Sequence, residues 1–327
     1  MTAAGQSILV IGCGVVGLSS AIRLLEAGDQ VTIWARDLPP NTTSNVAAAI
    51  WGPYQAFPFE RVLAWGERTF AEFCRLAEQP ETGIVLTPTL ELLERPAPDP
   101  WWRTGVRDFR RAAPAELPPG YADGYAYTTP VIEMGIYLPF LLRRFQQLGG
   151  SIVRRSLESF DEAFAHSPIV IDCAGLGARE LAADPALYPI RGQIIRVRRP
   201  AAINRALLDE AGHGRHPLTY IVPRSADCVL GGVAEPGEES LDPAPATAAD
   251  ILARAIALEP ALRDAAIVAH CVGLRPGRAS VRLEVEPVAG RGAIIHNYGH
   301  GGAGVTLSWG CADEVAGLRR TWFDPGR

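Results

Sequence analysis

Three glycines at a fixed spacing constrain the fold more than any other feature of this sequence. A short apolar segment over 7–12 leads into Gly12-Cys13-Gly14-Val15-Val16-Gly17, and residues 15–27 follow with helical periodicity. In such a strand–turn–helix the first glycine permits the tight turn, the second lets a diphosphate approach the backbone, and the third lets the helix pack on the strand. The helix N-terminus then attracts the diphosphate. With a second strand expected over 31–34, residues 1–35 predict a βαβ unit that binds a dinucleotide.

The residues after the second expected strand leave the identity of the dinucleotide open. An NAD site places an acid about 20 residues beyond the glycines, where it holds the adenosine ribose, and Asp37 stands near that place. Its neighbour Arg36 could instead meet the 2′-phosphate of NADP. A solvent-exposed ion pair between Arg36 and Asp37, with no role in binding, is the third interpretation.

A second glycine-rich turn, near the end of the chain, favours a flavin. An expected strand over 293–297 is followed by Tyr298-Gly299-His300-Gly301-Gly302-Ala303-Gly304-Val305-Thr306, which lead into a predicted helix over 304–318. A reduced flavin carries negative charge at its N1/O2 edge, and backbone N–H groups at a helix N-terminus would raise its electron affinity. NAD(P) enzymes have no need of such a site. Another expected strand, 168–173, ends in Cys173-Ala174-Gly175, where the backbone either passes a cofactor or makes an ordinary turn.

Composition removes several other classes of protein. All 31 basic residues are arginine, which excludes a pyridoxal Schiff base, a P-loop lysine and a lysine base. A net charge of −5 offers no broad basic field for nucleic acid or anionic lipid. No apolar run reaches the ~18 residues of a membrane span, and residues 1–7 are too polar for a signal peptide, so we expect a cytoplasmic protein.

The six cysteines lie far apart and lack the spacing of metal ligands. We therefore expect buried, reduced thiols and no metal site. A disulfide between Cys228 and Cys271 is the alternative, because both fall in strand-like runs of the same region.

The remaining pattern predicts an α/β nucleotide domain built from separated segments and interrupted by a second, α+β domain. Residues 95–119 are expected to be irregular. Further helices are expected over 59–77, 133–148 and 247–258, and strands over 83–93, 151–157, 193–198, 219–222, 228–232, 267–274 and 281–285.

Five stretches, in a matching order, carry a resemblance to a known family. They are 10–19, Thr42-Thr43-Ser44-Asn45-Val46-Ala47-Ala48-Ala49-Ile50-Trp51, Arg191-Gly192-Gln193-Ile194-Ile195, Gly273-Leu274-Arg275-Pro276 with Val281-Arg282-Leu283-Glu284, and Ile295-His296-Asn297-Tyr298-Gly299-His300-Gly301-Gly302. The sequence resembles the D-amino-acid oxidase family of flavoproteins over nearly the whole chain. The resemblance implies a Rossmann-like FAD-binding domain over 1–75, 151–190 and 276–327. It also implies an interleaved α+β substrate domain with a mixed or antiparallel sheet over 76–150 and 191–275.

The resemblance also implies an activity. A member of this family binds FAD non-covalently and oxidises a D-amino acid to an imino acid by hydride transfer from the substrate Cα to flavin N5. Oxygen then reoxidises the flavin and gives hydrogen peroxide, and water releases ammonia and the 2-oxo acid. The partners implied are a small D-amino acid and O2, with no nucleic acid and no membrane, and a homodimer is left open.

By the same resemblance, three residues contact the substrate. Arg275 binds the substrate carboxylate, a role that suits a planar and always charged guanidinium. Tyr220 places its hydroxyl on the same carboxylate, and the Gly302 carbonyl accepts a hydrogen bond from the amino group. The alternatives are a surface ion pair for Arg275 and a core aromatic for Tyr220.

The FAD contacts carry over in the same way and fall into four groups. The glycine turn faces the diphosphate, with Arg36 and Asp37 near adenosine, and hydroxyls of the next turn meet phosphate oxygens. A small-residue segment lies along the isoalloxazine, and the last turn covers its pyrimidine edge. The residues implied are Gly12, Cys13, Gly14, Val15, Val16, Gly17, Arg36, Asp37, Thr42, Thr43, Ser44, Ala48, Ala49, Ile50, Gly52, Leu157, Ala174, Gly301, Gly302, Gly304, Val305 and Thr306.

One loop departs from the family pattern. Mammalian members carry a second tyrosine four residues before the equivalent of Tyr220, on a mobile lid, and His216 stands there in this chain. The loop over 212–216 is short, and its Arg215 or a protonated histidine could bind a side-chain carboxylate, as in the sister family, D-aspartate oxidase. We interpret His296 and His300 as structural residues, not as general bases.

The leading hypothesis is therefore an FAD-dependent D-amino-acid oxidase acting on neutral substrates. The alternatives are D-aspartate oxidase or a relative with another electron acceptor, an NADP-dependent dehydrogenase that reads Arg36, and a flavin-binding scaffold without activity.

Overall fold

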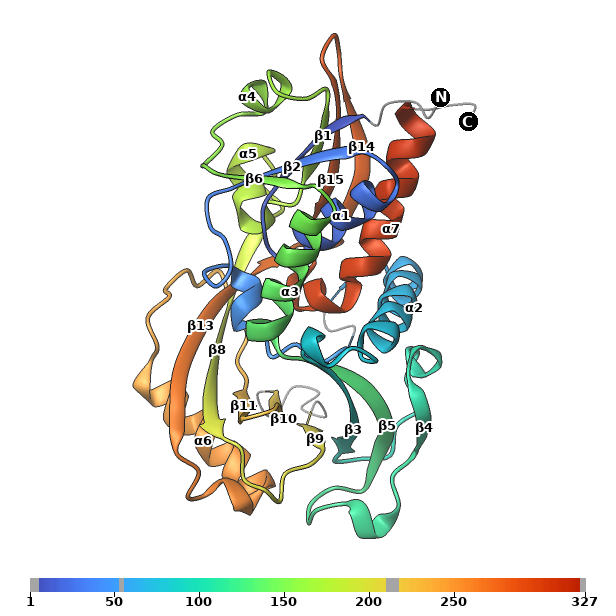
Figure 1. Cartoon of the computed structure of the whole chain (residues 1–327). Helices are drawn as coiled ribbons and strands as arrows, with labels where there is room; N and C mark the ends of the chain where they lie inside the picture. The colour runs from blue at the N-terminus through green and yellow to red at the C-terminus, as the bar shows by residue number, and fades with distance from the viewer. Residues whose placement is uncertain (1–5, 53–55, 210–217, 324–327) are drawn as a thin grey trace.

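Two β-sheets organise the chain, one above the other in Figure 1. The computed structural model describes residues 6–52, 56–209 and 218–323. Successive segments alternate between the two sheets, so neither sheet comes from one continuous stretch of sequence. The predicted α/β fold class, with an interleaved second part, is confirmed.

The first sheet carries the glycine-rich turn. Its order is β14-β15-β7-β1-β2-β6, with β14 antiparallel at one edge and the other strands parallel. In β1, Ile8 and Val10 are buried on one face and Leu9 and Ile11 on the other, which explains the continuous apolar run. The strands are β1 (Ser7–Ile11), β2 (Gln30–Ala35), β6 (Ser151–Arg154), β7 (Ile169–Asp172), β14 (Arg282–Val288) and β15 (Gly292–Tyr298).

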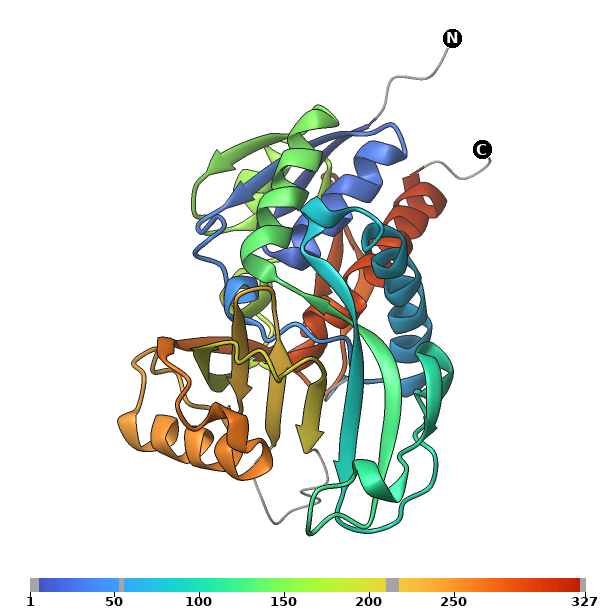
Figure 2. The same cartoon turned by 60° about the horizontal axis from the view of Figure 1, so that its bottom comes forward.

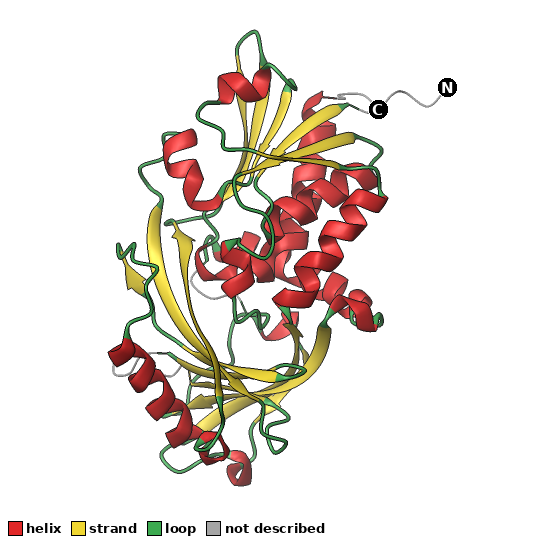
Figure 3. Cartoon of the chain, turned by 60° about the vertical axis from the view of Figure 1, so that its left-hand side comes forward, coloured by secondary structure: helices red, strands yellow, loops and turns green. Residues whose placement is uncertain are grey.

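Helices cover both faces of this sheet, as Figure 3 shows. On one face lie α1 (Val15–Glu26), α3 (Met134–Gln147) and α7 (Gly304–Phe323), with α2 (Phe59–Leu76) packed outside α7. The other face carries the short helices α4 (Phe160–Phe164) and α5 (Ala178–Leu181).

The second sheet is mixed and forms the lower half of the molecule in Figure 1. Its order is β12-β8-β11-β10-β9-β3-β5-β4, with β13 paired to β8, and only β3 and β9 among its described pairs run parallel. Helix α6 (Pro245–Leu258) packs on one face, at the outside of the molecule in Figure 2. The strands are β3 (Ile84–Leu93), β4 (Arg107–Arg111), β5 (Asp123–Ile132), β8 (Tyr188–Arg198), β9 (Ala206–Asp209), β10 (Thr219–Pro223), β11 (Asp227–Gly231), β12 (Glu235–Pro236) and β13 (Ile267–Gly277).

Most expected elements are present, with ends that differ by a few residues, and the errors cluster in the second sheet. Strands β5, β9 and β12 were not predicted. The segment over 95–119 was expected to be irregular and contains β4.

All six cysteines are free, so the Cys228–Cys271 disulfide is not formed. Within the described residues, we find no helix with both the length and the apolar character needed to span a membrane.

The division into two domains stays a prediction, and one helix argues for a different boundary. Residues 76–150 were assigned to the substrate domain. Helix α3 lies in that range, yet Tyr137 and Leu141 are buried in one cluster with α1 and β1 of the first sheet. We propose that α3 belongs with the nucleotide-binding part.

Helices α2 and α7 approach closely at one glycine. A Cβ added at Gly310 would overlap the backbone of Trp65, whereas a Cβ at Gly317, two turns further along α7, would meet no described atom within 4 Å. The spacing of the two helices therefore depends on Gly310.

We expect Gly310→Ala to lower the free energy of unfolding by about 1–3 kcal/mol, because the added methyl forces the helices apart. Gly317→Ala is the matched control and should leave stability unchanged or raise it by up to ~1 kcal/mol through helix propensity. Urea denaturation of both variants measures the difference. Equal effects of the two substitutions would contradict the close approach.

Candidate functional site

One large cavity, of about 710 Å³, is lined by residues of both sheets. This volume is within the usual range for a ligand site. Every residue that the sequence assigned to a cofactor or substrate lines it: Gly12, Cys13, Gly14, Val15, Val16, Gly17, Arg36, Asp37, Thr42, Thr43, Ser44, Ala48, Ala49, Ile50, Gly52, Leu157, Ala174, Tyr220, Arg275, Gly301, Gly302, Gly304, Val305 and Thr306. The individual roles given to them stay predictions.

The glycine-rich turn has the backbone that a diphosphate cradle needs. Gly12 has φ +104°, and a Cβ there would overlap the carbonyl oxygen of Cys173. A Cβ at Gly17 would overlap the carbonyl of Gly12, so the third glycine sets how closely α1 approaches β1. Burial raises the pKa of the Cys13 thiol to about 12, so it is uncharged at neutral pH and does not repel an anion.

The turn over 42–46 contacts the N-terminus of α1. The Val15 N–H donates to Ser44 Oγ at 3.1 Å. The Thr42 hydroxyl donates to Asn45 Oδ1 at 2.8 Å, which fixes the turn. For the predicted contact with a phosphate, the Thr42 hydroxyl would have to turn its proton from Asn45 to the phosphate oxygen.

The segment over 47–52 is held from three sides, and residues 48–52 within it are predicted to lie along the isoalloxazine. The Ala49 carbonyl accepts from the Ile132 N–H of β5 at 2.8 Å. The Thr306 hydroxyl of α7 donates to the Gly52 carbonyl at 2.9 Å. The buried Arg224 donates to the carbonyls of two more residues of the segment, at 2.7 and 3.0 Å. These contacts fix a wall of small residues on which a planar ring can lie.

Sequence reasoning missed Arg224, because it lies in the short connection between β10 and β11 and belongs to no motif. Its guanidinium supports the segment over 47–52 through backbone oxygens, and such a contact leaves no pattern in the sequence.

The turn before α7 places a buried histidine at the cavity. His300 is 3% exposed and lines the cavity, and its Nε2 atom has no hydrogen-bond partner among the described residues. Burial lowers the pKa of His300 to about 4, so the ring is neutral at pH 7. An orphaned polar atom of this kind, next to Gly301 and the start of α7, fits a polar ligand such as the pyrimidine edge of a flavin.

Glycines also make room for the two residues predicted to bind a carboxylate. The Arg275 guanidinium of β13 lies where a Cβ of Gly192 would project, and the Tyr220 ring of β10 lies where a Cβ of Gly231 would project. In the strand order β13-β8-β11-β10, both side chains therefore lie flat across the neighbouring strand. They can do so because β8 and β11 carry glycine, without a side chain, at these positions.

Together the two side chains form a site for an anion. Arg275 donates to the carbonyl of Val233 at 3.0 Å and also hydrogen-bonds the Tyr220 side chain. Burial raises the pKa of Tyr220, against the opposing effect of Arg275, so the phenol is protonated at neutral pH. A guanidinium beside a protonated phenol is a donor set that suits a carboxylate.

At the other end of the cavity, Arg36 and Asp37 form an ion pair at 2.8 Å, with the Arg36 side chain 78% exposed. Both residues line the cavity, so the exposed pair and a contact with adenosine are compatible. Sequence reasoning missed Arg155, whose guanidinium lies 4.2 Å from the centre of the Trp34 ring at this end.

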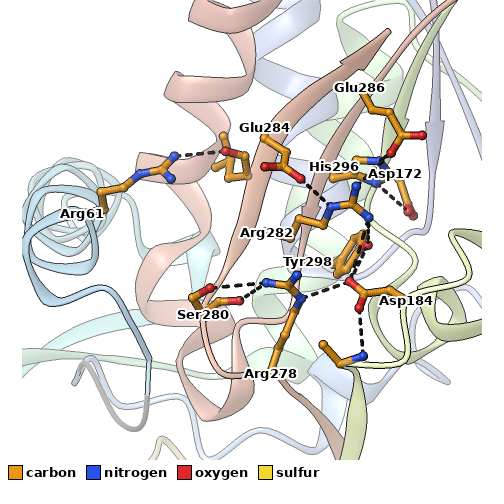
Figure 4. Close-up of polar contacts among 12 residues, drawn as sticks. Arg61, Asp172, Asp184, Arg278, Ser280, Arg282, Glu284, Glu286, His296 and Tyr298 are labelled. Carbon is orange, nitrogen blue, oxygen red and sulfur yellow. Dashed lines mark hydrogen bonds and ion pairs between the residues drawn. The ribbon is translucent and has the colours of Figure 1, made fainter. Parts of the chain in front are cut away.

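Figure 4 shows the buried His296 between Glu286, which is exposed, and Asp172, which is buried. Its Nε2 atom is 3.0 Å from Glu286, and its Nδ1 atom is 3.4 Å from Asp172. Asp172 also accepts from the N–H of Ala174, which lines the cavity. These contacts agree with the interpretation of His296 as a structural residue.

The loop with Arg215 and His216 lies outside the described residues. Among the described residues, no group of three or more His, Cys, Asp or Glu is placed to hold a metal ion.

The depressed pKa of His300 predicts a pH-dependent stability. In the folded state burial opposes protonation of the His300 ring. The unfolded chain therefore binds more protons below the ordinary histidine pKa of about 6.5. Relative to a His300→Gln variant, the wild-type chain without FAD should lose roughly 3 kcal/mol of unfolding free energy between pH 6.5 and 4. Urea denaturation at several pH values measures this, and a pH-independent difference between the two chains would contradict it.

Comparison with known proteins agrees with this geometry. A D-amino-acid oxidase of Rubrobacter xylanophilus is 54% identical over 311 residues, which cover 95% of this chain and 94% of that protein. A human protein named D-aspartate oxidase is 36% identical over 332 residues, with 95% of this chain and 94% of that protein covered.

Solved structures share the fold at lower sequence identity. A glycine oxidase from Geobacillus kaustophilus superposes with a TM-score of 0.79 at 19% identity, over 96% of this chain and 94% of that one. The family model described as FAD dependent oxidoreductase matches residues 7–318. The glycine cradle, the orphaned His300 nitrogen and the wall over 47–52 fit the cofactor named in that description. The chain belongs to the family of FAD-dependent oxidoreductases.

Proposed function

We propose that this protein is a D-amino-acid oxidase, which converts a D-amino acid, water and O2 to a 2-oxo acid, ammonia and hydrogen peroxide. The observation that carries the proposal is the Arg275–Tyr220 pair in the same cavity as the glycine cradle and the segment over 47–52. A carboxylate held by this pair would place its Cα toward that segment.

The chain's own residues would orient the substrate. Arg275 provides the fixed charge for the carboxylate, and Tyr220 donates its phenolic proton to the same group. The Gly302 carbonyl is the proposed acceptor for the amino group. FAD, when bound, supplies the hydride acceptor, N5. Catalysis then depends on orientation, which agrees with a neutral His300 and with the absence of lysine from the sequence.

D-Aspartate oxidase is the alternative, because a human protein of that name is 36% identical to this chain. The cations that could bind an acidic side chain, Arg215 and its neighbouring histidines, lie outside the described residues. A homodimer and a cytoplasmic location stay predictions.

A peroxide assay across D- and L-amino acids tests this proposal directly. We expect peroxide from D-alanine and larger D-amino acids, slower release from D-aspartate, and none from the L-enantiomers. Faster oxidation of D-aspartate than of D-alanine would make the protein a D-aspartate oxidase. Equal oxidation of L-amino acids, or no peroxide at all from a flavin-loaded protein, would overturn the proposal.

Replacement of the carboxylate-binding arginine tests the site itself. Arg275→Ala should lower kcat/KM for D-alanine by at least ~3 kcal/mol, more than about a hundredfold, because the substrate carboxylate loses its charged partner. The flavin spectrum should not change, since the substitution lies outside the predicted cofactor contacts. Arg68→Ala on the exposed face of α2 is the control and should leave kcat/KM unchanged. Near-normal turnover by Arg275→Ala would remove this residue from the site.

A further inference from the structure

A buried guanidinium joins the strand that carries Tyr220 to the segment over 47–52. Arg224 follows β10 directly and is 8% exposed, and its Nη2 atom donates to the carbonyls of Ala47 and Ala48 at 2.7 and 3.0 Å. Both alanines line the cavity. Arg224 therefore connects a strand of the second sheet with the segment that contains the predicted isoalloxazine contacts.

In the part of the chain that the structure describes, the Arg224 side chain bonds backbone oxygens and no carboxylate. Asp227, the acid nearest to it in sequence, binds Arg196 at 2.6 Å instead, and the Nε atom of Arg224 has no partner among the described residues. Burial lowers the pKa of Arg224, against the opposing effects of Asp227 and Glu133. Because burying such a charge is costly, we expect it to serve the segment that it contacts.

The backbone of this segment is strained directly after the two carbonyls. Ala49 has φ +56°, in the left-handed region that residues other than glycine disfavour. A residue stays in this region only when the surrounding contacts hold it there. Arg224 holds the carbonyls of the two preceding residues, and the Ile132 N–H donates to the Ala49 carbonyl at 2.8 Å. The bend at Ala49 therefore depends on both contacts.

The same segment packs against the strand that binds substrate. Ala48 and Ile50 contact a buried cluster that includes Tyr220 of β10. Burial raises the pKa of Tyr220, and the charges of Arg275 and Arg224 oppose this rise. The Arg224 guanidinium thus acts electrostatically on the proposed carboxylate site while it contacts the predicted flavin wall.

We propose that Arg224 is a positioning residue, which shapes the segment over 47–52 for FAD and sets its distance from the substrate-binding strand. Without side-chain donors at this place, the two carbonyls would be released and the bend at Ala49 would relax. FAD would then bind less tightly, and substrate on Arg275 and Tyr220 would meet a flavin that is less well placed. The proposal rests on the predicted contact of this segment with the isoalloxazine and not on the identity of the substrate.

FAD binding to the apoprotein is the first test, followed by the change in protein fluorescence as FAD is added. In Arg224→Met, which keeps an unbranched stem and removes the donors, we expect the dissociation constant to rise at least about tenfold, because two hydrogen bonds that hold the segment are lost. Arg224→Lys should have a smaller effect, since a single nitrogen makes both bonds in the wild-type chain.

Arg199→Met is the matched control. This arginine donates to the Arg224 carbonyl at 2.9 Å, on the same turn, and is not among the cavity-lining residues. Its loss should leave the dissociation constant for FAD within about twofold of wild type, because it removes no bond to the segment. Circular dichroism establishes that each variant is folded.

Steady-state kinetics separate positioning from a merely structural role. At saturating FAD, Arg224→Met should lower kcat for D-alanine at least about fivefold with KM within about threefold of wild type, because Arg275 and Tyr220 still bind the carboxylate. A merely structural residue would lower the stability of the chain and leave kcat of the folded, FAD-loaded enzyme unchanged. Lack of oxidation by the wild-type enzyme would overturn the proposed function, and FAD binding would then decide the role of Arg224.

Hydrogen exchange of the wild-type chain tests the same coupling without a variant. FAD should slow exchange over 47–52 and also over 223–228, a turn with no predicted FAD contact that Arg224 connects to the segment. Amides of α6 are the control and should change little. Protection confined to 47–52, or a folded Arg224→Met chain whose dissociation constant is within about twofold of wild type, would overturn the proposal. If Arg224→Met does not fold, the exchange pattern decides.

Discussion

The antiparallel pairing of β8 with β13 is the constraint on which the rest of the site depends. These two long strands begin or end beside the first sheet and run along the edge of the second, as Figure 1 shows. Their register sets Gly273 opposite Gly192 and Arg275 opposite Ile190, so the Arg275 guanidinium lies over a strand position without a side chain. Because β14 and β15 follow β13 directly, the same pairing links the proposed carboxylate site to the turn before α7. A slip by one residue would move Arg275 to the other face of the sheet.

Charge changes in a regular way along the cavity. The helix N-termini of α1 and α7 offer partial positive charge where a dinucleotide is expected. Arg275 follows with a full positive charge. Cys13, Tyr220 and His300 are all kept neutral at pH 7 by burial, so they add hydrogen-bonding groups without adding charge. These charges suit a ligand pair that carries a diphosphate and a carboxylate.

The sequence sufficed to predict the first sheet and its cofactor-facing turns, because glycine spacing and apolar runs are local signals. It also located Arg275 and Tyr220, through a resemblance over nearly the whole chain and not through any local rule. It did not indicate Glu91, Arg224 or Arg155. Glu91 becomes a cavity residue only through the pairing of β3 with β5 and β9, two strands that the pattern did not reveal. Arg224 acts through backbone carbonyls of a segment far away in sequence, and such contacts follow from the fold alone.

The central claim is that the guanidinium of Arg275 binds a carboxylate beside the cofactor. Titration of the oxidised holoenzyme with propanoate, a carboxylate without an amino group to oxidise, measures that contact without turnover. The account predicts a saturable change in the flavin absorption spectrum with propanoate, and a much weaker change with propionamide, in which a neutral amide replaces the carboxylate. A propionamide titration that perturbs the flavin as strongly as propanoate would contradict it.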